Sequence, residues 1–315
     1  MQRIVIDTDG GVDDALALLL ALAWPDTRIE AITTVHGNVP VESATKNVNE
    51  VLHIAGCEVR VVAGCAAPLA GAPVFATDVH GQDGLGGWIR TAPARAVGLN
   101  GVAASEAILE LARRFPGEIT LITIGPLTNA AVALRKDPEG FRLLKEIVIM
   151  GGAVWERGNV TATAEFNLFA DPVAAREVVH GGIPLTLVGL DVTHKAVFTR
   201  ERVEMLLGDR SDLRARFLRC ICERMFSFYK PRVGSEIFYL HDPLAVGVAL
   251  DRSLVETQRM SVDIETRGEL TRGMVIAERR PWVKTAANVD VCTSVEAERF
   301  LDLFCERVFG RQAPT

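Results

Sequence analysis

The sequence predicts an α/β fold in which an open, mostly parallel central sheet is covered by helices on both faces. Short apolar runs alternate with amphipathic runs along the first 190 residues, and the apolar runs carry few polar positions, as in strands that are buried on both faces. With 315 residues, 49% of them hydrophobic, the chain can bury the core that such a fold needs. We expect one domain over residues 1–315, because no Pro/Ser/Gly-rich linker divides it.

The expected strands and helices alternate from the N-terminus. Strands are predicted over residues 4–7, 29–35, 59–63, 119–124, 147–150 and 185–190. Helices are predicted from residue 12 and over residues 41–55, 103–115, 127–134 and 172–179. The long glycine-rich segment 64–100 between the third strand and the third helix contains His80, Asp83 and Trp88. Long segments without regular structure are usually functional, so we expect an active-site loop there.

Beyond Thr199 the pattern becomes mainly helical. Helices are predicted over residues 202–207, 213–229, 243–250 and 295–309, with strand-like pieces over residues 262–265, 274–277 and 286–291. This part is expected to form a helical cap region against the sheet.

The composition limits the kinds of partner that the protein can bind and the part of the cell in which it is expected. A net charge of -6 and an isoelectric point near 5.6 give no basic footprint for nucleic acid or an anionic membrane. The most apolar stretch, residues 15–24, is too short to span a bilayer, which needs about 20 residues. No basic and apolar leader is recognisable, so a cytoplasmic location is expected, and the six cysteines are expected to be free thiols.

The most acidic part of the chain directly follows the first predicted strand. Asp7, Asp9, Asp13 and Asp14 place four carboxylates within eight residues, and two glycines between them allow a tight turn. Open α/β sheets bind ligands where their strands end, and carboxylates in one crevice repel each other unless a cation neutralises them. The cluster therefore predicts a site for a hard, oxygen-preferring metal ion.

Other polar groups follow the later strands at the same edge of the expected sheet. They lie in the segments 36–38, 125–129, 151–152, 158–159 and 164–167, whose amide and carboxylate groups suit a hydroxyl-rich ligand such as a sugar. Far along the chain, His241-Asp242-Pro243 precedes a helical run. Asp242 is expected to be an N-cap, with the proline at the first helical position, and is compatible with metal ligation. A lone histidine in this place is more often structural, but the neighbouring carboxylate can also hold His241 protonated for proton donation.

Together these motifs resemble those of the inosine-uridine nucleoside hydrolases. The resemblance rests on seven segments in the family's order, residues 7–14, 32–38, 80–81, 125–129, 149–152, 164–167 and 241–243. It implies the nucleoside hydrolase fold with its Rossmann-like core, hydrolysis of the N-glycosidic bond of ribonucleosides, bound Ca²⁺ and a homo-oligomer, either a dimer or a tetramer.

The resemblance also implies roles for individual residues. Asp9, Asp14 and Asp242 would bind Ca²⁺ through their side chains, Ile124 would bind it through its backbone carbonyl, and Asp7 would orient its neighbours. A water molecule on calcium, deprotonated by Asp9, would attack the sugar, and His241 would protonate the departing base. The remaining substrate contacts would come from Asp13, Asn38, His80, Met150, Asn159, Glu165, Asn167, Tyr229 and Asp242. The base is expected to face residues 80–88 and 228–239, where Phe228, Tyr229 and Tyr239 can stack on it or bind it by hydrogen bonds.

Two positions depart from the family pattern, and two other functions remain open. Gly10 stands where proline is common and is expected only to loosen the turn, whereas His36 replaces a small or aliphatic residue and alters the expected pocket wall.

Asp7-Thr-Asp9-Gly also fits the nucleophile loop of haloacid-dehalogenase-like Mg²⁺-dependent phosphatases, although Gly11 does not. A nucleoside-binding protein without catalytic activity would show the same ligand set.

Overall fold

The computed structural model describes residues 1–93, 101 and 103–310. The central sheet consists of β1 (Gln2–Thr8), β2 (Thr27–Thr34), β3 (Val61–Ala63), β4 (Ile119–Thr123), β5 (Glu146–Met150), β6 (Leu185–Val188), β9 (Val255–Met260) and β12 (Val289–Val295). Within the described residues these eight strands lie in the order β3-β2-β1-β4-β5-β6-β12-β9. Neighbouring strands are parallel except β12 and β9, which confirms the predicted open and mostly parallel sheet.

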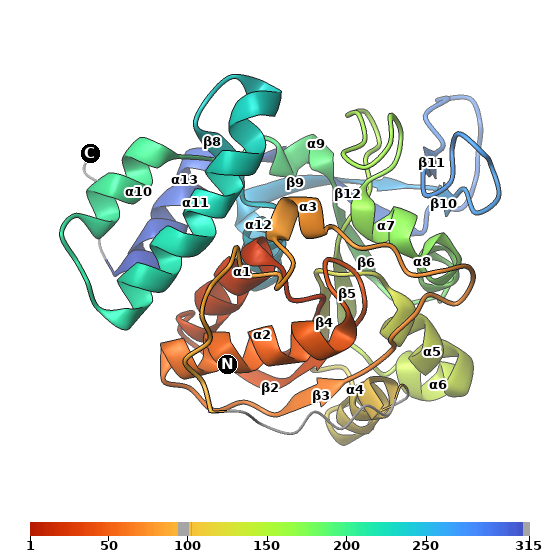
Figure 1. The fold of residues 1–315 in the computed structure, drawn as a ribbon. Helices are drawn as coiled ribbons and strands as arrows, with labels where there is room; N and C mark the ends of the chain where they lie inside the picture. Colours follow the sequence, from red (N-terminus) through yellow and green to blue (C-terminus); the bar gives the residue numbers. More distant parts are fainter. Residues whose placement is uncertain (94–100, 102, 311–315) are drawn as a thin grey trace.

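Helices cover both faces of this sheet (Figure 1). One face packs against α1 (Val12–Leu22), α2 (Val41–Ala55) and α12 (His241–Leu250), and the other packs against α4 (Ala103–Arg114), α5 (Thr128–Lys136) and α8 (Pro172–Val179). Within β1, Ile4 and Ile6 enter the first core and Val5 enters the second, as the two-residue period of a strand requires. The continuous apolar runs of the sequence are therefore strands that are buried on both faces.

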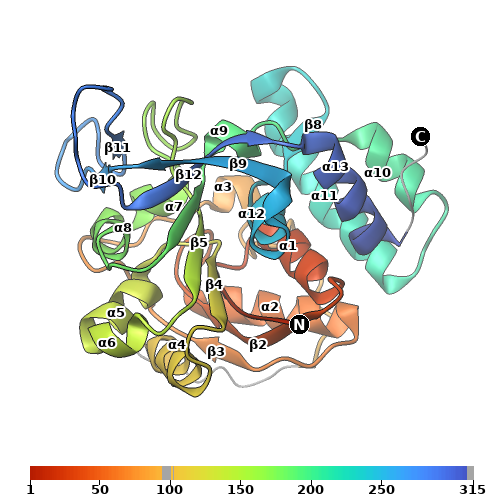
Figure 2. The same cartoon turned by 180° about the vertical axis from the view of Figure 1, so that it is seen from behind.

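The C-terminal helices form a separate layer beside α1 and α12. This layer is on the left in Figure 1 and on the right in Figure 2, which shows the molecule from behind. They are α10 (Arg200–Leu207), α11 (Leu213–Val233) and α13 (Ala297–Phe304), followed by a π-helical turn at Cys305–Phe309. Phe198, Phe238 and Phe304 pack edge to face beneath them. This layer agrees with the predicted helical cap region.

Short elements complete the fold around the loops. They are α3 (Thr77–His80), α6 (Pro138–Phe141), α7 (Phe166–Ala170), α9 (Leu190–Thr193), the antiparallel pairs β7 (Val197–Thr199) with β8 (Ile237–Tyr239) and β10 (Val262–Ile264) with β11 (Val275–Ala277), and a 3-10 turn at Arg252–Leu254. No helix of the described residues is both long and apolar enough to cross a membrane. All six cysteines are free thiols, as predicted.

Several boundaries differ from the sequence-based prediction. The sixth strand stops at Val188 and the chain turns into α9. Strand β9 was missed because four consecutive polar and exposed residues, from Glu256 to Arg259, occupy most of this sheet edge. Helix α11 continues past Tyr229 through Pro231 to a left-handed Gly234. The predicted loop 64–100 contains α3, and its residues 94–100 lie outside the described residues.

The order of the strands creates the crevice that holds the site. The chain moves outward from β1 to β2 and β3, then returns to the other side of β1 and continues through β4, β5 and β6. The carboxyl ends of β1 and β4 therefore diverge at a topological switch point, where open α/β sheets bind ligands. Asp9 follows β1 and Ile124 follows β4, so both lie at this point.

Candidate active site

A cavity of about 320 Å³ opens above the switch point. Its size is that of a small-molecule site. Residues from separate parts of the chain line it, among them Asp13, Asn38, His80, Ile124, Met150, Asn159, Glu165, Asn167, Tyr229, His241 and Asp242. The fold thus brings most of the predicted site residues to one cavity.

Buried carboxylates form the acidic part of this site. Asp13, Asp14 and Asp242 each offer an oxygen atom within 4.8 Å of the others, and all three side chains are buried. One carboxylate oxygen of Asp13, Oδ1, is buried without a hydrogen-bond partner. An all-oxygen, negatively charged set with an unsatisfied buried oxygen fits a hard divalent cation.

Asp9 stands beside this group and is held mainly by Asn38. The backbone N–H of Asn38 donates to Oδ2 of Asp9 at 2.7 Å, and its side-chain amide donates to Oδ1 at 2.8 Å. The same amide donates to Oδ2 of Asp14 at 3.0 Å. Gly37 permits this approach, because a Cβ there would lie 2.0 Å from an oxygen of Asp9. Asn38 therefore ties the Asp9 and Asp14 carboxylates together.

The start of α1 fixes Asp14. Its Oδ2 accepts the backbone N–H of Gly11 at 2.8 Å, and its Oδ1 accepts the hydroxyl of Thr8 and the N–H of Asp9. The preceding Gly10 has a φ of +70°, a value that the ring of proline cannot adopt. A proline at this position would therefore require a different backbone path.

Burial and mutual repulsion make the carboxylates hard to ionise together. Burial, reinforced by the charge of Asp14, raises the pKa of Asp13 to about 7 and that of Asp9 well above its usual range. Burial and the charges of Asp13, Asp14 and Asp9 raise the pKa of Asp242 in the same way. The cluster carries an electrostatic cost that a bound cation would relieve.

Asp7 is fully buried and does not line the cavity. Its Oδ1 accepts hydrogen bonds from the hydroxyl of Thr33 at 2.5 Å and the amide of Asn129 at 2.8 Å. The same amide binds the carbonyl of Thr34, and its oxygen accepts the N–H of Cys65. Asn129 thereby joins the carboxyl ends of β1, β2 and β3 beneath the site.

His80 occupies one side of the cavity. Its Nδ1 accepts the backbone N–H of Val12 at 3.1 Å and lies 3.8 Å from Oδ1 of Asp13. Burial lowers the pKa of His80 to about 4, so the ring is neutral at pH 7. Because Nδ1 accepts, the proton of the neutral ring resides on Nε2.

His241 occupies another side and contacts two hydroxyl groups. Its Nδ1 lies 2.8 Å from Oγ1 of Thr193, and its Nε2 lies 3.3 Å from the hydroxyl of Tyr229. Burial, with smaller contributions from His194 and His80, lowers its pKa to about 3. A protonated ring in the free protein is therefore not supported, because desolvation and the two neighbouring histidines all favour the neutral form.

The helix geometry around this histidine also differs from the prediction. Helix α12 begins at His241 with Leu240 as its N-cap, which makes Asp242 its second residue and Pro243 its third. The N-cap role predicted for Asp242 is wrong. Its carboxylate is left to join the acidic group.

Glu165 and Asn167 brace the wall opposite α1. Glu165 caps α7 by accepting the N–H groups of Asn167 and Leu168, and it also accepts the N–H of Gly152 at 3.0 Å. The amide of Asn167 donates to the carbonyls of Ile124 at 3.3 Å and Met150 at 3.2 Å. The Ile124 carbonyl retains a second lone pair for another ligand.

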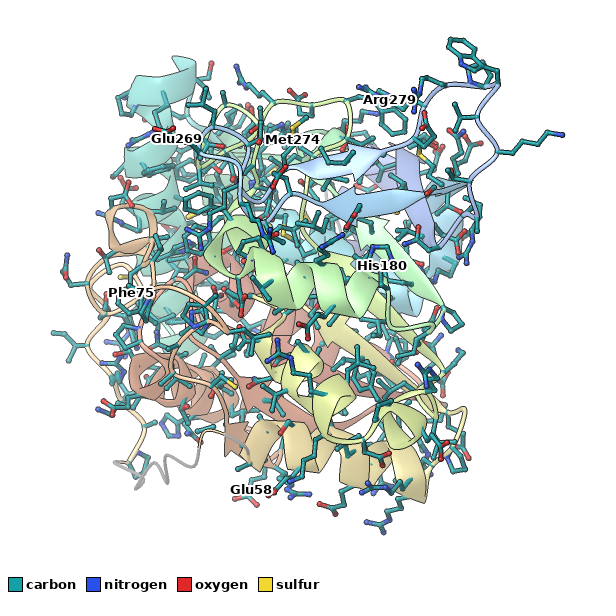
Figure 3. All side chains as sticks on the ribbon, turned by 90° about the vertical axis from the view of Figure 1, so that its right-hand side faces the viewer. Glu58, Phe75, His180, Glu269, Met274 and Arg279 are labelled. Atoms are coloured by element: carbon teal, nitrogen blue, oxygen red, sulfur yellow. The ribbon has the colours of Figure 1, made fainter. Side chains whose placement is uncertain are left out.

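The outer rim of the cavity comes from α3 and α11. Met225, Phe228, Tyr229 and Arg232 follow one another at helical spacing along one side of α11. Arg224 on the same helix donates to the carbonyls of Thr77, Asp78 and Val79, so it fixes α3 against α11. Phe75 lies on the outer surface in Figure 3 and contributes to the rim.

Some residues expected near the base lie elsewhere. Trp88 packs edge to face on Phe217 at 5.3 Å and donates to Glu50, while Tyr239 stacks behind His241. Residues 81–88 do not line the described cavity. His36 is fully buried below it, against the hydroxyl of Thr128 at 3.1 Å, so it does not alter the pocket wall.

Several wall residues were not predicted individually. They are Val74, Phe75, Ala76, Asp78, Val79, Val160, Phe166 and Met225. Arg232 lies within the segment 228–239 that was expected to face the base, although the helix was expected to end at residue 229. The helical period, extended backward from Tyr229, would have found Met225.

Comparison with known proteins places this site in a family. Residues 4–302 match the family model described as inosine-uridine preferring nucleoside hydrolase. The chain is 35% identical to the non-specific ribonucleoside hydrolase RihC of Shigella boydii, over 94% of this chain and 95% of that protein. It is 36% identical to the pyrimidine-specific ribonucleoside hydrolase RihA of a Shewanella species, over 97% of this chain and 95% of that protein.

Solved structures agree with this assignment. The purine-preferring ribonucleoside hydrolase of Gardnerella vaginalis superposes with a TM-score of 0.91 at 30% identity, and the match covers 98% of both chains. The match over nearly the whole chain, together with the aspartate cluster at the switch point, shows that the chain belongs to the inosine-uridine preferring nucleoside hydrolase family and is an enzyme of that class.

Proposed function

We propose that this chain hydrolyses the N-glycosidic bond of ribonucleosides to ribose and a free purine or pyrimidine base, with Ca²⁺ as its cofactor. The observation that carries the proposal is the meeting of three buried carboxylates with two histidines and a tyrosine around one cavity. Breaking this bond develops positive charge on the sugar and negative charge on the base. Carboxylates on one side and proton donors on the other suit these two charges.

The proposed calcium ligands are the side chains of Asp9, Asp14 and Asp242 and the carbonyl of Ile124. Asp14 and Asp242 belong to the group of converging oxygens, and Ile124 lines the same cavity. Asp13 also belongs to that group, so it would stand next to the proposed ion. Asp9 lies beside the group. When bound, Ca²⁺ would offset the carboxylate charge and help to hold the ribose hydroxyls and a water molecule in place.

Ribose would lie between the acidic cluster and the braced wall. Asn159 uses its Oδ1 to accept the N–H of Phe166 at 2.9 Å, which leaves its amide hydrogens for a sugar hydroxyl. Buried Glu165 likewise keeps lone pairs toward the cavity. We assign the sugar contacts to Asp13, Asn38, Met150, Asn159, Glu165, Asn167 and Asp242, all of which line the cavity.

Asp9 and His241 are the proposed base and acid. Burial raises the pKa of the Asp9 carboxylate, which strengthens it as an acceptor for the proton of the attacking water. Nε2 of His241 and the Tyr229 hydroxyl lie 3.3 Å apart at the end of the cavity proposed for the base, and His80 adds a third polar group there. His241 would pass a proton to the departing base, as a general acid does.

The base preference belongs to the outer rim. The guanidinium of Arg232 lies 3.7 Å above the Phe228 ring, which gives this end of the cavity both a stacking face and a positive charge. The named relatives include non-specific, pyrimidine-specific and purine-preferring enzymes. Homo-oligomer formation, the single domain and the cytoplasmic location remain predictions from the sequence.

Steady-state kinetics on a nucleoside panel tests the proposal. The purified protein in Ca²⁺ is given inosine, adenosine, uridine and cytidine, and free base and reducing sugar are both quantified. We expect at least one nucleoside to yield the two products in equal amounts, with no phosphate released from a phosphomonoester. Binding of nucleosides without cleavage would instead identify a catalytically silent binding protein. The family match over residues 4–302 already argues against the phosphatase alternative.

A further inference from the structure

The segment that carries Asn159 runs from the end of β5 to Glu165, the N-cap of α7. It contains bends and irregular backbone, and Ala164 forms an isolated bridge with Met274, which Figure 3 labels. The segment supplies Asn159 and Val160 to the cavity wall. Its second half is held from within, because the carbonyl of Ala164 accepts the N–H groups of Asn159 and Val160. The N–H groups of residues 154–156 in its first half instead bond to a side chain outside the segment.

Asp191 supplies that side chain. Its Oδ1 accepts the backbone N–H groups of Trp155 at 2.7 Å and Glu156 at 3.0 Å, and its Oδ2 accepts the N–H of Val154 at 2.9 Å. Three consecutive backbone donors thus converge on one half-buried carboxylate. Hydrogen bonds to an ionised acceptor are about twice as strong as neutral ones.

Among the described residues, no lysine, arginine or histidine forms an ion pair with Asp191, although Lys195 lines the same surface hollow. A second contact links the two elements, because His194 places Nδ1 3.7 Å from Oε2 of Glu156. The arrangement of Asp191 is therefore directed at the backbone of residues 154–156.

The helix that carries Asp191 also reaches the proposed general acid. Helix α9 begins with the N–H of Leu190 bound to the carbonyl of Gly152 at 2.8 Å, and Thr193 at its end contacts Nδ1 of His241 at 2.8 Å. Helix α9 therefore contacts the first half of the Asn159 segment, at Gly152 and residues 154–156, and also His241.

We propose that Asp191 is a positioning residue for substrate binding: it sets the path of residues 154–156 and thereby the place of Asn159 against ribose. The inference rests on the proposed function, since it assigns Asn159 to the sugar. Asp191 itself does not line the cavity. Its removal should weaken substrate binding and leave the groups that break the bond in place.

The test compares Asp191→Ala, Asp191→Asn and a control, Asp137→Ala, in the full-length protein with Ca²⁺. Asp137 also accepts a backbone N–H, that of Gly140, but lies outside the cavity. For the best nucleoside of the panel, Asp191→Ala should raise KM about tenfold, the size of one charge-assisted hydrogen bond, and change kcat less than about twofold. Asp191→Asn keeps one acceptor oxygen, so its KM should lie between those of the wild type and Asp191→Ala. The KM of the control Asp137→Ala should match that of the wild type.

A double-mutant cycle with Asn159→Ala separates positioning from general stability. If Asp191 acts through Asn159, adding Asp191→Ala to the Asn159→Ala variant should change KM less than about twofold. Independent effects that multiply would overturn the inference, and so would an unchanged KM in Asp191→Ala with only a lower melting temperature. Hydrogen exchange of residues 153–164 should rise in Asp191→Ala whether or not nucleosides are cleaved. A wild type that cleaves no ribonucleoside would refute the proposed function, whereas an active wild type without these effects would refute the role of Asp191 alone.

Discussion

Nδ1 of His241 lies 2.8 Å from the hydroxyl oxygen of Thr193, so the histidine proposed as general acid is oriented from behind by the end of α9. Its other nitrogen faces the Tyr229 hydroxyl at 3.3 Å. The hydrogen bond on one ring nitrogen fixes which nitrogen of a neutral imidazole carries the proton. Thr193 does not line the cavity, but in the proposed mechanism it would influence proton donation through His241.

Removal of this hydroxyl should slow the chemical step. Thr193→Val keeps the branched shape and should lower kcat for natural nucleosides about tenfold, with little change in KM, because one oriented hydrogen bond is lost. Thr193→Ser retains the hydroxyl and serves as the control. Equal kcat values for the two variants would show that the contact does not contribute to the reaction.

Loss of the acid itself should depend on the leaving group. His241→Ala should reduce kcat on inosine or uridine by about 10²- to 10⁴-fold, the usual contribution of a general acid. A 4-nitrophenyl riboside, whose leaving group needs no proton, should be cleaved at a rate much closer to that of the wild type. Parallel losses on both substrates would remove His241 from this role.

Asp9→Asn tests the proposed base. The change retains the size of the side chain next to Asn38 but removes the proton acceptor, so turnover of every nucleoside should be abolished. The melting temperature should be measured alongside, with Asp263→Asn as the control, because Asp263 is a carboxylate in an ion pair with Arg176 outside the cavity. Near-normal rates in Asp9→Asn would exclude Asp9 as the base.

Buried His36 should make the fold sensitive to acid. Burial lowers its pKa from 6.5 to about 4, so between these values the unfolded chain binds a proton that the folded chain does not. The stabilisation is therefore present above pH 6.5 and is lost as the pH falls to 4, by an amount on the order of 3 kcal/mol. In urea unfolding, His36→Gln should flatten the decline of stability over this range. An unchanged pH dependence would contradict the assignment.

Much of the fold could be predicted because the continuous apolar runs of the β/α units can be buried only as strands that are covered on both faces of the sheet. Strand β1 illustrates this: the alternating entry of Ile4, Val5 and Ile6 into two cores follows from their sequence alone. Strand β9 could not be found in this way, because its exposed edge requires little hydrophobicity. The sequence also gave no local signal for α9, where four residues turn away from the sheet directly after β6.

The site was predictable where motifs follow strand ends. Asp14 and Asp242 meet as predicted although 228 positions separate them in the chain. The neutral state of His241 was missed because desolvation depends on the whole surrounding fold. The anchoring by Asp191 was equally hidden, since its three partners are backbone N–H groups that side-chain identity does not reveal.

A calcium ion held by the aspartate cluster is proposed to support nucleoside hydrolysis. The most direct measurement is ribose release from the best nucleoside of the panel after chelation and again after Ca²⁺ is returned, in the wild type and in Asp242→Asn. We predict that chelation lowers the wild-type rate at least about a hundredfold, that Ca²⁺ restores it, and that Asp242→Asn recovers little, because the variant loses a charged ligand of the ion. Full activity of the chelated, metal-free wild type would contradict the account.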